Sequence, residues 1–338
     1  MANRLFVLAP VAAAAAMAVA ASATAYADDG SLVDSTHAIF MGGTAQPTPS
    51  TAYVEAADSL YLKPLGFADE LTSICNMVGN LPCDGSLQVL TTPEVFEFGP
   101  SSLQGETNLV YAVEAEYKAG DFSADNPLTV FAYSQSAILS SAAEQRLFDD
   151  GIPKDALHFV FIGDPSSESG IATNIYADTV QLFGGGTTGT TIANDIFNGI
   201  NEAQFAPGGV LAGVTPNDLY PTTIYNIDYD GVSDWQEDYD IGLNAPGGSP
   251  LLGFANGLFH FFTTHVEYLG LTPDQIATGV ATTDGLTTTI NIPDLSDTGT
   301  MINDFTALVD AFGHGLADSG SLLALANTVI DLFDPNYF

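Results

Sequence analysis

The sequence predicts an α/β protein with a doubly wound, mainly parallel sheet of about five strands. Five short runs are almost continuously apolar and are bounded by turn residues, which is typical of strands buried on both faces of a parallel sheet. Helix-forming stretches separate the runs, and this alternation favours the doubly wound class. The predicted strands are 36–41, 87–90, 128–132, 157–162 and 223–227, and the predicted helices are 52–60, 108–119 and 137–148.

The first 27 residues have the pattern of a secretory signal peptide. One basic residue, Arg4, precedes an apolar stretch, and Ala25-Tyr26-Ala27 forms a small-x-small cleavage site before two acids. We expect cleavage after residue 27 and a protein that is secreted or held in the cell envelope, with no stable membrane span. The length of the stretch also allows a retained membrane anchor, and that alternative stays open.

The chain is strongly acidic, with 41 Asp and Glu against five Lys and Arg and a formal net charge of −36. Such a charge repels phosphate backbones and anionic headgroups, which excludes nucleic acid as a partner. We interpret the acidity as an aid to solubility or salt tolerance outside the cell. The acids between 228 and 240 lack the spacing of an EF-hand loop. Neither a metal nor an organic cofactor is expected.

The chain has two cysteines, Cys75 and Cys83, which are eight positions apart. In an exported protein we expect them to form a disulfide. A pair of free buried thiols is the alternative, and no further ligands for a zinc site lie nearby.

Ser134 lies where the third predicted strand turns into a helix. This is the setting of a nucleophilic serine, because the turn lifts the hydroxyl above the sheet edge and directs the N–H of Gln135 towards an oxyanion. The usual pattern is G-x-S-x-G, whereas Ala132 and Ser136 stand at the two glycine positions here. The pentapeptide alone is equally compatible with an ordinary buried serine. Whether Ser134 is a nucleophile therefore depends on finding a base and an acid elsewhere in the chain.

Two stretches extend beyond the predicted sheet. Residues 166–221 are rich in Gly, Thr and Asn and are expected to form an insertion over the carboxyl edge of the sheet, either a substrate-binding flap or a surface excursion without a role. Residues 291–338 carry an apolar helical pattern and are expected to pack as a C-terminal extension on the domain formed by 28–290.

A nucleophilic serine needs a base and an acid, and in the α/β-hydrolase arrangement the chain order is Ser, Asp, His. Asp230 and Asp234 lie just beyond the last predicted strand, where the orienting acid belongs. Three histidines, His260, His265 and His314, follow downstream. All candidates for a hydrolytic site are therefore present in the required order.

Four motifs lie along the chain in a fixed order: Gly42-Gly43-Thr44 with Pro47-Thr48-Pro49, Tyr133-Ser134-Gln135-Ser136-Ala137, Tyr229-Asp230-Gly231-Val232-Ser233-Asp234, and His265-Val266-Glu267-Tyr268. Together they resemble the PE-PPE domain of mycobacteria and their relatives, over about residues 36–290. That family is similar to cutinases and is regarded as a group of serine α/β hydrolases that act on acyl esters. The resemblance implies a cutinase-like α/β-hydrolase fold.

The resemblance also implies roles for individual residues. It places the nucleophile on Ser134 and the base on His265, at the end of an apolar helix over 251–268, while His260 lies on a different helix face. Both Asp230 and Asp234 match the family pattern. We expect Asp234 to be the acid, since it stands three residues after a glycine and follows a small residue. Asp230, which could instead fix the turn through backbone amides, stays the alternative.

The second oxyanion donor is expected in the loop after the first strand. Gly42-Gly43-Thr44 lies there, and the backbone N–H of Thr44 would act together with that of Gln135. The family usually has glycine where Ala45 stands.

These features imply a secreted serine ester hydrolase of the esterase, lipase or cutinase type that works through an acyl-enzyme. The resemblance implies acyl-ester or lipid substrates, with a cell-envelope glycolipid among the candidates. Transfer of the acyl group to a sugar or lipid hydroxyl shares every step, so an acyltransferase is also compatible. The alternative is a secreted, non-catalytic binding or envelope protein that keeps the fold.

Overall fold

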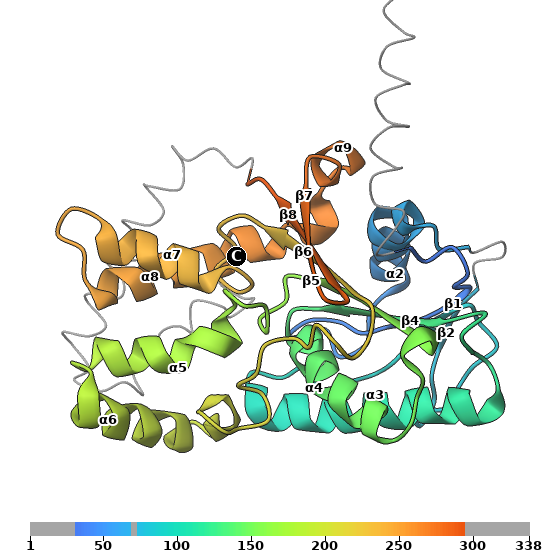
Figure 1. Cartoon of the computed structure of the whole chain (residues 1–338), viewed down its shortest axis with the longest axis horizontal. Helices are drawn as coiled ribbons and strands as arrows, with labels where there is room; N and C mark the ends of the chain where they lie inside the picture. Colours follow the sequence, from blue (N-terminus) through green and yellow to red (C-terminus); the bar gives the residue numbers. More distant parts are fainter. Residues whose placement is uncertain (1–30, 69–72, 295–338) are drawn as a thin grey trace, which may run out of the picture.

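The computed structural model describes residues 31–68 and 73–294, and these residues form one eight-stranded sheet between layers of helices (Figure 1). The strand order is β2-β3-β1-β4-β5-β6-β8-β7, and every neighbouring pair is parallel except β7 and β8. The predicted doubly wound, mainly parallel sheet is confirmed. The strands are β1 (His37–Phe40), β2 (Ile74–Asn76), β3 (Leu87–Val89), β4 (Leu128–Tyr133), β5 (Leu157–Ile162), β6 (Thr222–Ile227), β7 (Val280–Asp284) and β8 (Thr287–Ile292).

The five predicted strands correspond to β1, β3, β4, β5 and β6, with ends that agree to within one residue. The other three strands lack the continuous apolar pattern that made these five visible. β2 is short and partly exposed, and β7 is exposed throughout. β8 alternates in burial and extends to Ile292, two residues beyond the domain boundary expected at residue 290.

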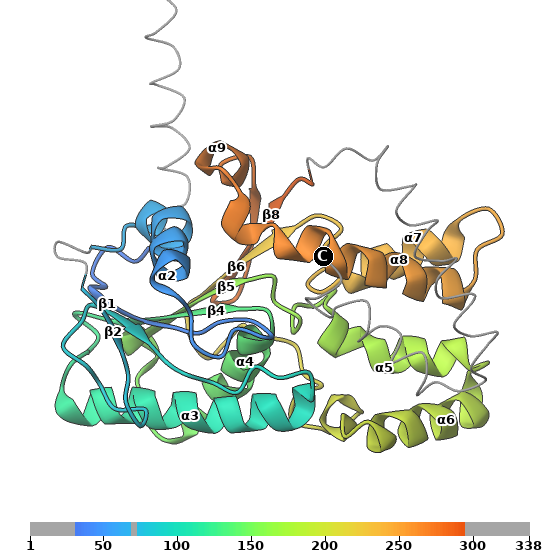
Figure 2. The same ribbon diagram turned by 180° about the vertical axis from the view of Figure 1, so that it is seen from behind.

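Helices cover both faces of the sheet (Figures 1 and 2). Helices α3 and α4 pack on one face, and α2 packs on the other. Successive residues of β4 show this two-sided burial: Val130 and Ala132 join the core under α3 and α4, whereas Phe131 packs against Tyr53 and Tyr61 on the opposite face. The α-helices are α2 (Thr51–Ala57), α3 (Phe98–Ala119), α4 (Gln135–Asp149), α5 (Ile171–Leu182), α6 (Gly186–Gly199), α7 (Trp235–Asn244), α8 (Pro250–Phe262) and α9 (Pro273–Ile276).

Two pairs of helices, α5 with α6 and α7 with α8, extend to one side of the sheet, on the left in Figure 1. The first pair and the short helix η4 (Ala203–Phe205) lie within residues 166–221, the segment expected to form an insertion. Phe197 and Phe205 from this segment pack in one apolar cluster with Ile138 of α4. The segment is thus joined to the helix that follows β4.

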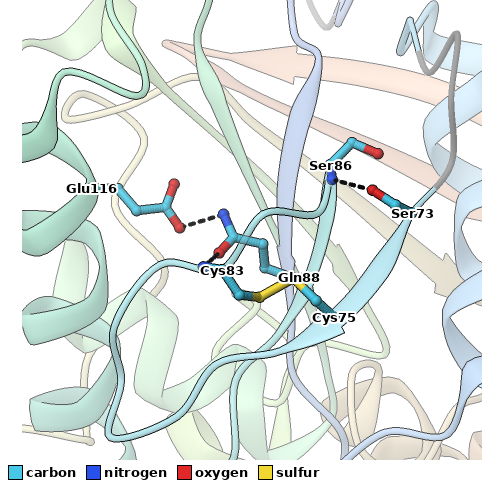
Figure 3. Close-up of a disulfide and its surroundings, with 6 residues drawn as sticks. All are labelled: Ser73, Cys75, Cys83, Ser86, Gln88 and Glu116. Carbon is cyan, nitrogen blue, oxygen red and sulfur yellow. Dashed lines mark hydrogen bonds between the residues drawn. A yellow bond between two sulfur atoms is a disulfide. The ribbon is translucent and has the colours of Figure 1, made fainter.

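The predicted disulfide between Cys75 and Cys83 is confirmed and closes the loop that follows β2 (Figure 3). Gln88 of β3 ties this loop to the body of the protein. Its side-chain oxygen accepts a hydrogen bond from the Cys83 N–H at 2.8 Å, and its amide donates to Glu116 of α3 at 2.6 Å. Burial raises the pKa of Glu116 to about 7.

Several sequence predictions lie outside the described residues. These are the signal peptide at 1–27, nearly all of the helical extension at 291–338, and His314. Among the residues that are described, none of the helices has the length and apolar character needed to cross a membrane.

Candidate active site

Ser134 occupies the sharp turn between β4 and α4 with backbone angles φ 59° and ψ −119°. A positive φ is strained for a side chain with a Cβ and costs about 1–3 kcal/mol, so the surrounding turn must hold it. Ser136 helps to do so, because its hydroxyl accepts from the Tyr133 N–H at 2.8 Å and donates to the Tyr133 carbonyl at 3.0 Å. This strained elbow on a parallel sheet confirms the α/β-hydrolase fold class.

His265 lies against the serine, with its Nε2 2.8 Å from the Ser134 Oγ. Helix α8 ends at Phe262 and His265 lies in the following 3₁₀ turn, Thr264–Val266, so the continuous helix expected over 251–268 is wrong. The ring stacks on Tyr133, whose hydroxyl donates to the His265 carbonyl at 2.7 Å. Ring and backbone of the histidine are therefore both held by the residue that precedes the nucleophile.

Gly163, directly after β5, leaves the space that the imidazole occupies. A Cβ at this position would lie 2.7 Å from the His265 Cε1 and 2.9 Å from the Tyr268 ring, and the residue also has a φ of +57°. Any larger residue would push the histidine away from Ser134. Nothing in the local sequence around Gly163 indicated this requirement, because the contact joins residues that are far apart in the chain.

Asp230 is the acid that contacts His265, and the expectation that Asp234 would do so is wrong. The Asp230 Oδ2 and Oδ1 lie 2.9 and 3.0 Å from the His265 Nδ1. Because a carboxylate accepts at Nδ1, the proton of the neutral ring lies there and Nε2 is free to accept from Ser134. The turn after β6 directs Asp230 under the imidazole, whereas Asp234 is four residues further on and opens α7.

Asp234 instead lies in an acidic surrounding. Its carboxylate accepts from the Tyr229 N–H at 3.3 Å, and burial together with the charge of Glu237 raises its pKa to about 7. The position of Asp234 three residues after Gly231 favoured it in the sequence, but this residue lies at the start of helix α7. The spacing could not show which of two neighbouring carboxylates points inwards.

Asp230 is fully buried and has several hydrogen-bond donors around it. The Val232 N–H donates at 2.9 Å, the Ser233 hydroxyl at 2.9 Å and the Tyr268 hydroxyl at 2.7 Å. Burial alone would raise the pKa of Asp230, but the charge of His265 and the hydrogen bonds from His265, Tyr268 and Val232 outweigh it and lower the pKa below its ordinary value. The carboxylate therefore stays ionised without contact to water.

The two expected oxyanion donors also come together. The Thr44 hydroxyl donates to the Gln135 side-chain oxygen at 3.0 Å, which joins the loop after β1 to the start of α4. In the described part of the chain, neither the Thr44 N–H nor the Gln135 N–H has a hydrogen-bond acceptor. Ala45 has a φ of 66°, which explains the family's preference for glycine there, and its N–H donates to the Glu94 carbonyl at 2.7 Å.

An apolar cavity of about 210 Å³ opens beside Ser134 and Gln135. Its walls come mainly from α5, α6 and η4, with contributions from the start of α3, from α4 and from α8. Apolar side chains dominate the lining, among them Ile138, Ile171, Ile175, Phe197, Phe205 and Phe261. A cavity of this kind suits a hydrocarbon chain rather than a sugar or a charged group.

His260 does not contact the serine. Its Nδ1 lies 2.7 Å from Asp238, and burial lowers the pKa of the imidazole. Burial and the nearby charges of Asp234 and Asp230 raise the pKa of Asp238 to about 10. Within residues 31–68 and 73–294, no group of three or more His, Cys, Asp or Glu side chains has the geometry to hold a metal ion.

Comparison with known proteins finds a family match and several mycobacterial relatives. Residues 82–206, which include Ser134, match the PE-PPE domain. An uncharacterised PPE family protein, PPE28 of Mycobacterium tuberculosis, is 32% identical over 73% of this chain and 31% of its own length. Esterase PE16 of the same organism is 27% identical over 76% of this chain and 42% of its own length. The chain thus spans less than half the length of these relatives.

Two solved structures are also similar at lower identity. The lysin B of a mycobacteriophage is 20% identical over 40% of this chain and 49% of that chain, with a TM-score of 0.28. A cutinase-like protein from Cryptococcus sp. is 16% identical over 73% of this chain and 98% of that chain, with a TM-score of 0.33. The match over residues 82–206 identifies a PE-PPE domain in this chain, and mycobacterial PE and PPE proteins are among its relatives.

Proposed function

We propose that this protein is a serine ester hydrolase in which Ser134, His265 and Asp230 form the catalytic triad. The observation that carries the proposal is the continuous hydrogen-bonded chain from the Ser134 Oγ through the imidazole to a buried, ionised carboxylate. Nucleophile, base and orienting acid need this arrangement for acyl transfer. The similarity to an esterase among the mycobacterial relatives adds support.

In the proposed reaction the Ser134 oxygen attacks the ester carbonyl while the His265 Nε2 takes the hydroxyl proton. Asp230 stabilises the resulting imidazolium through Nδ1 and does not itself take the proton. The N–H groups of Thr44 and Gln135 donate to the tetrahedral oxyanion. His265 then protonates the departing alcohol, and the same steps in reverse order transfer the acyl group from Ser134 to water.

The apolar cavity beside Ser134 favours an ester with a hydrocarbon acyl chain. With a volume of about 210 Å³ and a mainly apolar lining, the cavity has room for an acyl chain longer than an acetyl group. Esters of medium-length fatty acids, including lipids, are therefore the proposed substrates. A sugar or lipid hydroxyl could replace water as the acyl acceptor. The signal-like start of the chain supports action outside the cytoplasm.

Turnover of 4-nitrophenyl esters tests the proposal. We expect hydrolysis of the hexanoate and octanoate esters at a rate that falls by roughly 10⁴-fold or more in Ser134→Ala, because the nucleophile is lost. Ser31→Ala, at an exposed serine far from the elbow in the chain, is the matched control and should keep full activity. Equal rates for the wild type and Ser134→Ala would refute the enzyme and favour a non-catalytic binding protein.

A further inference from the structure

The start of helix α3 has no cap of its own. Glu97 stands at the N-cap position without a side-chain hydrogen bond, and the first turn contains no acidic residue. The first N–H groups of a helix have no partner within the helix and carry a partial positive charge. In this 22-residue helix they need an acceptor from elsewhere.

Glu202 supplies that acceptor from the 166–221 segment. Its Oε2 accepts from the Gly99 N–H at 2.6 Å, and the Phe98 N–H also donates to the carboxylate. The side chain is buried, with an exposed fraction of 7%, and burial raises its pKa to about 7. In the described part of the chain no Lys or Arg forms an ion pair with Glu202, and the hydrogen bond from the helix end holds the carboxylate there.

The fit between the two elements is close. A Cβ at Gly99 would lie 2.9 Å from the Glu202 Oε2 and 3.0 Å from the Asn201 carbonyl. A larger residue at position 99 would require the Glu202 carboxylate and the Asn201 carbonyl to shift. The contact joins two segments that are 103 residues apart in the chain.

Both sides of this contact belong to the wall of the apolar cavity beside Ser134. Phe98 lines the cavity from α3, and Ile200, Glu202 and Phe205 line it from the 166–221 segment. Ile200 is about half exposed, so this part of the wall lies at the surface. If the contact opens, the cavity loses one wall while the hydrogen bonds among Ser134, His265 and Asp230 remain.

We propose that Glu202 is a specificity-determining residue, which fastens the 166–221 segment to the start of α3 and so keeps the acyl cavity closed around long chains. The proposal rests on the proposed ester hydrolysis. Its structural part, the fastening of the two segments, is independent of that activity. Phe98 and Phe205 line the same cavity as Ser134, and we expect a hexanoyl chain to use this wall more than an acetyl group does.

The fastening is measured by hydrogen–deuterium exchange on full-length protein in a Ser134→Ala background, where no catalysis occurs. We expect Glu202→Ala to speed exchange by about tenfold in residues 98–101 and 186–205, as expected for loss of hydrogen bonds to a charged group. Exchange in β4 and β5 should not change. Glu97→Ala removes a carboxylate that makes no cap hydrogen bond at this helix end and whose charge raises the pKa of Glu202, so it should not speed exchange in either region.

Two further variants guard against a folding defect. Glu202→Gln keeps one acceptor oxygen and should give a smaller change in the same two regions. Gly99→Ala displaces the carboxylate from the other side and should reproduce the pattern of Glu202→Ala, although alanine favours the helix. Unchanged exchange in 186–205 for Glu202→Ala, or faster exchange that includes β4 and β5, would overturn the proposal.

The effect on specificity is measured with Ser134 intact. We expect Glu202→Ala to lower kcat/KM for 4-nitrophenyl hexanoate by about tenfold relative to 4-nitrophenyl acetate, because the longer chain uses the wall more. An equal loss on both esters would overturn the specificity role. If the wild-type protein hydrolyses neither ester, the proposed function and the specificity role both fail, and the exchange experiment still decides the fastening.

Discussion

Tyr268 offers a sharp test of how the acid is held, because one oxygen atom separates it from phenylalanine. Its hydroxyl donates to the Asp230 Oδ2 at 2.7 Å and accepts from the Ile227 N–H at 3.0 Å, in a fully buried setting. Tyr268→Phe keeps the ring and removes both of these hydrogen bonds, together with the contact at 3.2 Å between the Tyr268 and Ser233 hydroxyls. Asp230 keeps its contacts with Ser233 and Val232.

The size of the effect follows from these contacts. A hydrogen bond to a charged acceptor contributes about 1.5–3 kcal/mol, so kcat/KM should fall by roughly tenfold to a hundredfold if the loss weakens the hold of Asp230 on the imidazolium. The Ile227 N–H is left buried without an acceptor, and the free energy of unfolding at pH 7 should fall by about 2–4 kcal/mol in total.

The dependence on pH has a definite sign. The pKa of Asp230 is lowered in the folded protein, so its ionisation stabilises the fold above its unfolded pKa of about 3.8, and this contribution is lost as the pH falls through the folded pKa. Tyr268→Phe removes one donor to the carboxylate and raises that pKa. Its destabilisation relative to the wild type should therefore shrink as the pH falls below about 4.

The assay combines 4-nitrophenyl hexanoate hydrolysis with urea unfolding at several pH values. Tyr220→Phe is the matched control, because the Tyr220 hydroxyl is also buried and donates to a backbone carbonyl, that of Ile152, at 3.0 Å. It should lose stability but keep kcat/KM. If both variants lose activity equally, or if Tyr268→Phe keeps full activity, Tyr268 does not position the acid.

Three other predictions use single substitutions. Asp230→Asn should lower kcat by roughly 10⁴-fold in ester hydrolysis while Asp234→Asn keeps activity within about tenfold, and the opposite ranking would restore Asp234 as the acid. Ala45→Gly relieves strain at a φ of 66° but adds backbone entropy, so urea unfolding should change by less than about 1 kcal/mol with turnover retained; loss of turnover would contradict this. Burial raises the pKa of Glu94 from 4.5 to about 8, so its contribution to stability is full below pH 4.5 and is lost as the pH rises to 8. Glu94→Gln should thus gain stability relative to the wild type across that window, by up to about 4 kcal/mol, and a constant difference would refute the shift.

The parts of the fold that could be predicted are those with a strong local signal. β5 is apolar at nearly every position and was predicted to the residue, whereas β7 is exposed at every position and lies at the sheet edge beside β8. Helix α3 begins at Phe98, ten residues before the predicted start. The prediction missed this first part because Gly99 and Pro100 normally interrupt helices. Proline is accepted in a first turn, and Glu202 provides the missing cap from outside the helix.

The candidate site also contains residues with a strong local sequence signal and residues without one. Ser134 and His265 could be found because each lies in a recognisable local motif, at a strand-to-helix turn and in an H-x-x-Y sequence. The choice between Asp230 and Asp234 depends on the direction of a turn, and local spacing favoured the wrong residue. Gly163 and Glu202 act through contacts with distant segments, which no pattern of neighbouring residues reveals.

The central claim is that the Ser134 hydroxyl is activated by His265 and Asp230. Mass spectrometry after treatment with a fluorophosphonate measures this directly, since the reagent forms a stable adduct only with an activated serine. The account predicts one adduct on the peptide that contains Ser134 in the wild type, strongly reduced labelling in Asp230→Asn, and none in Ser134→Ala. An unlabelled wild-type protein, or an adduct on another serine, would contradict it.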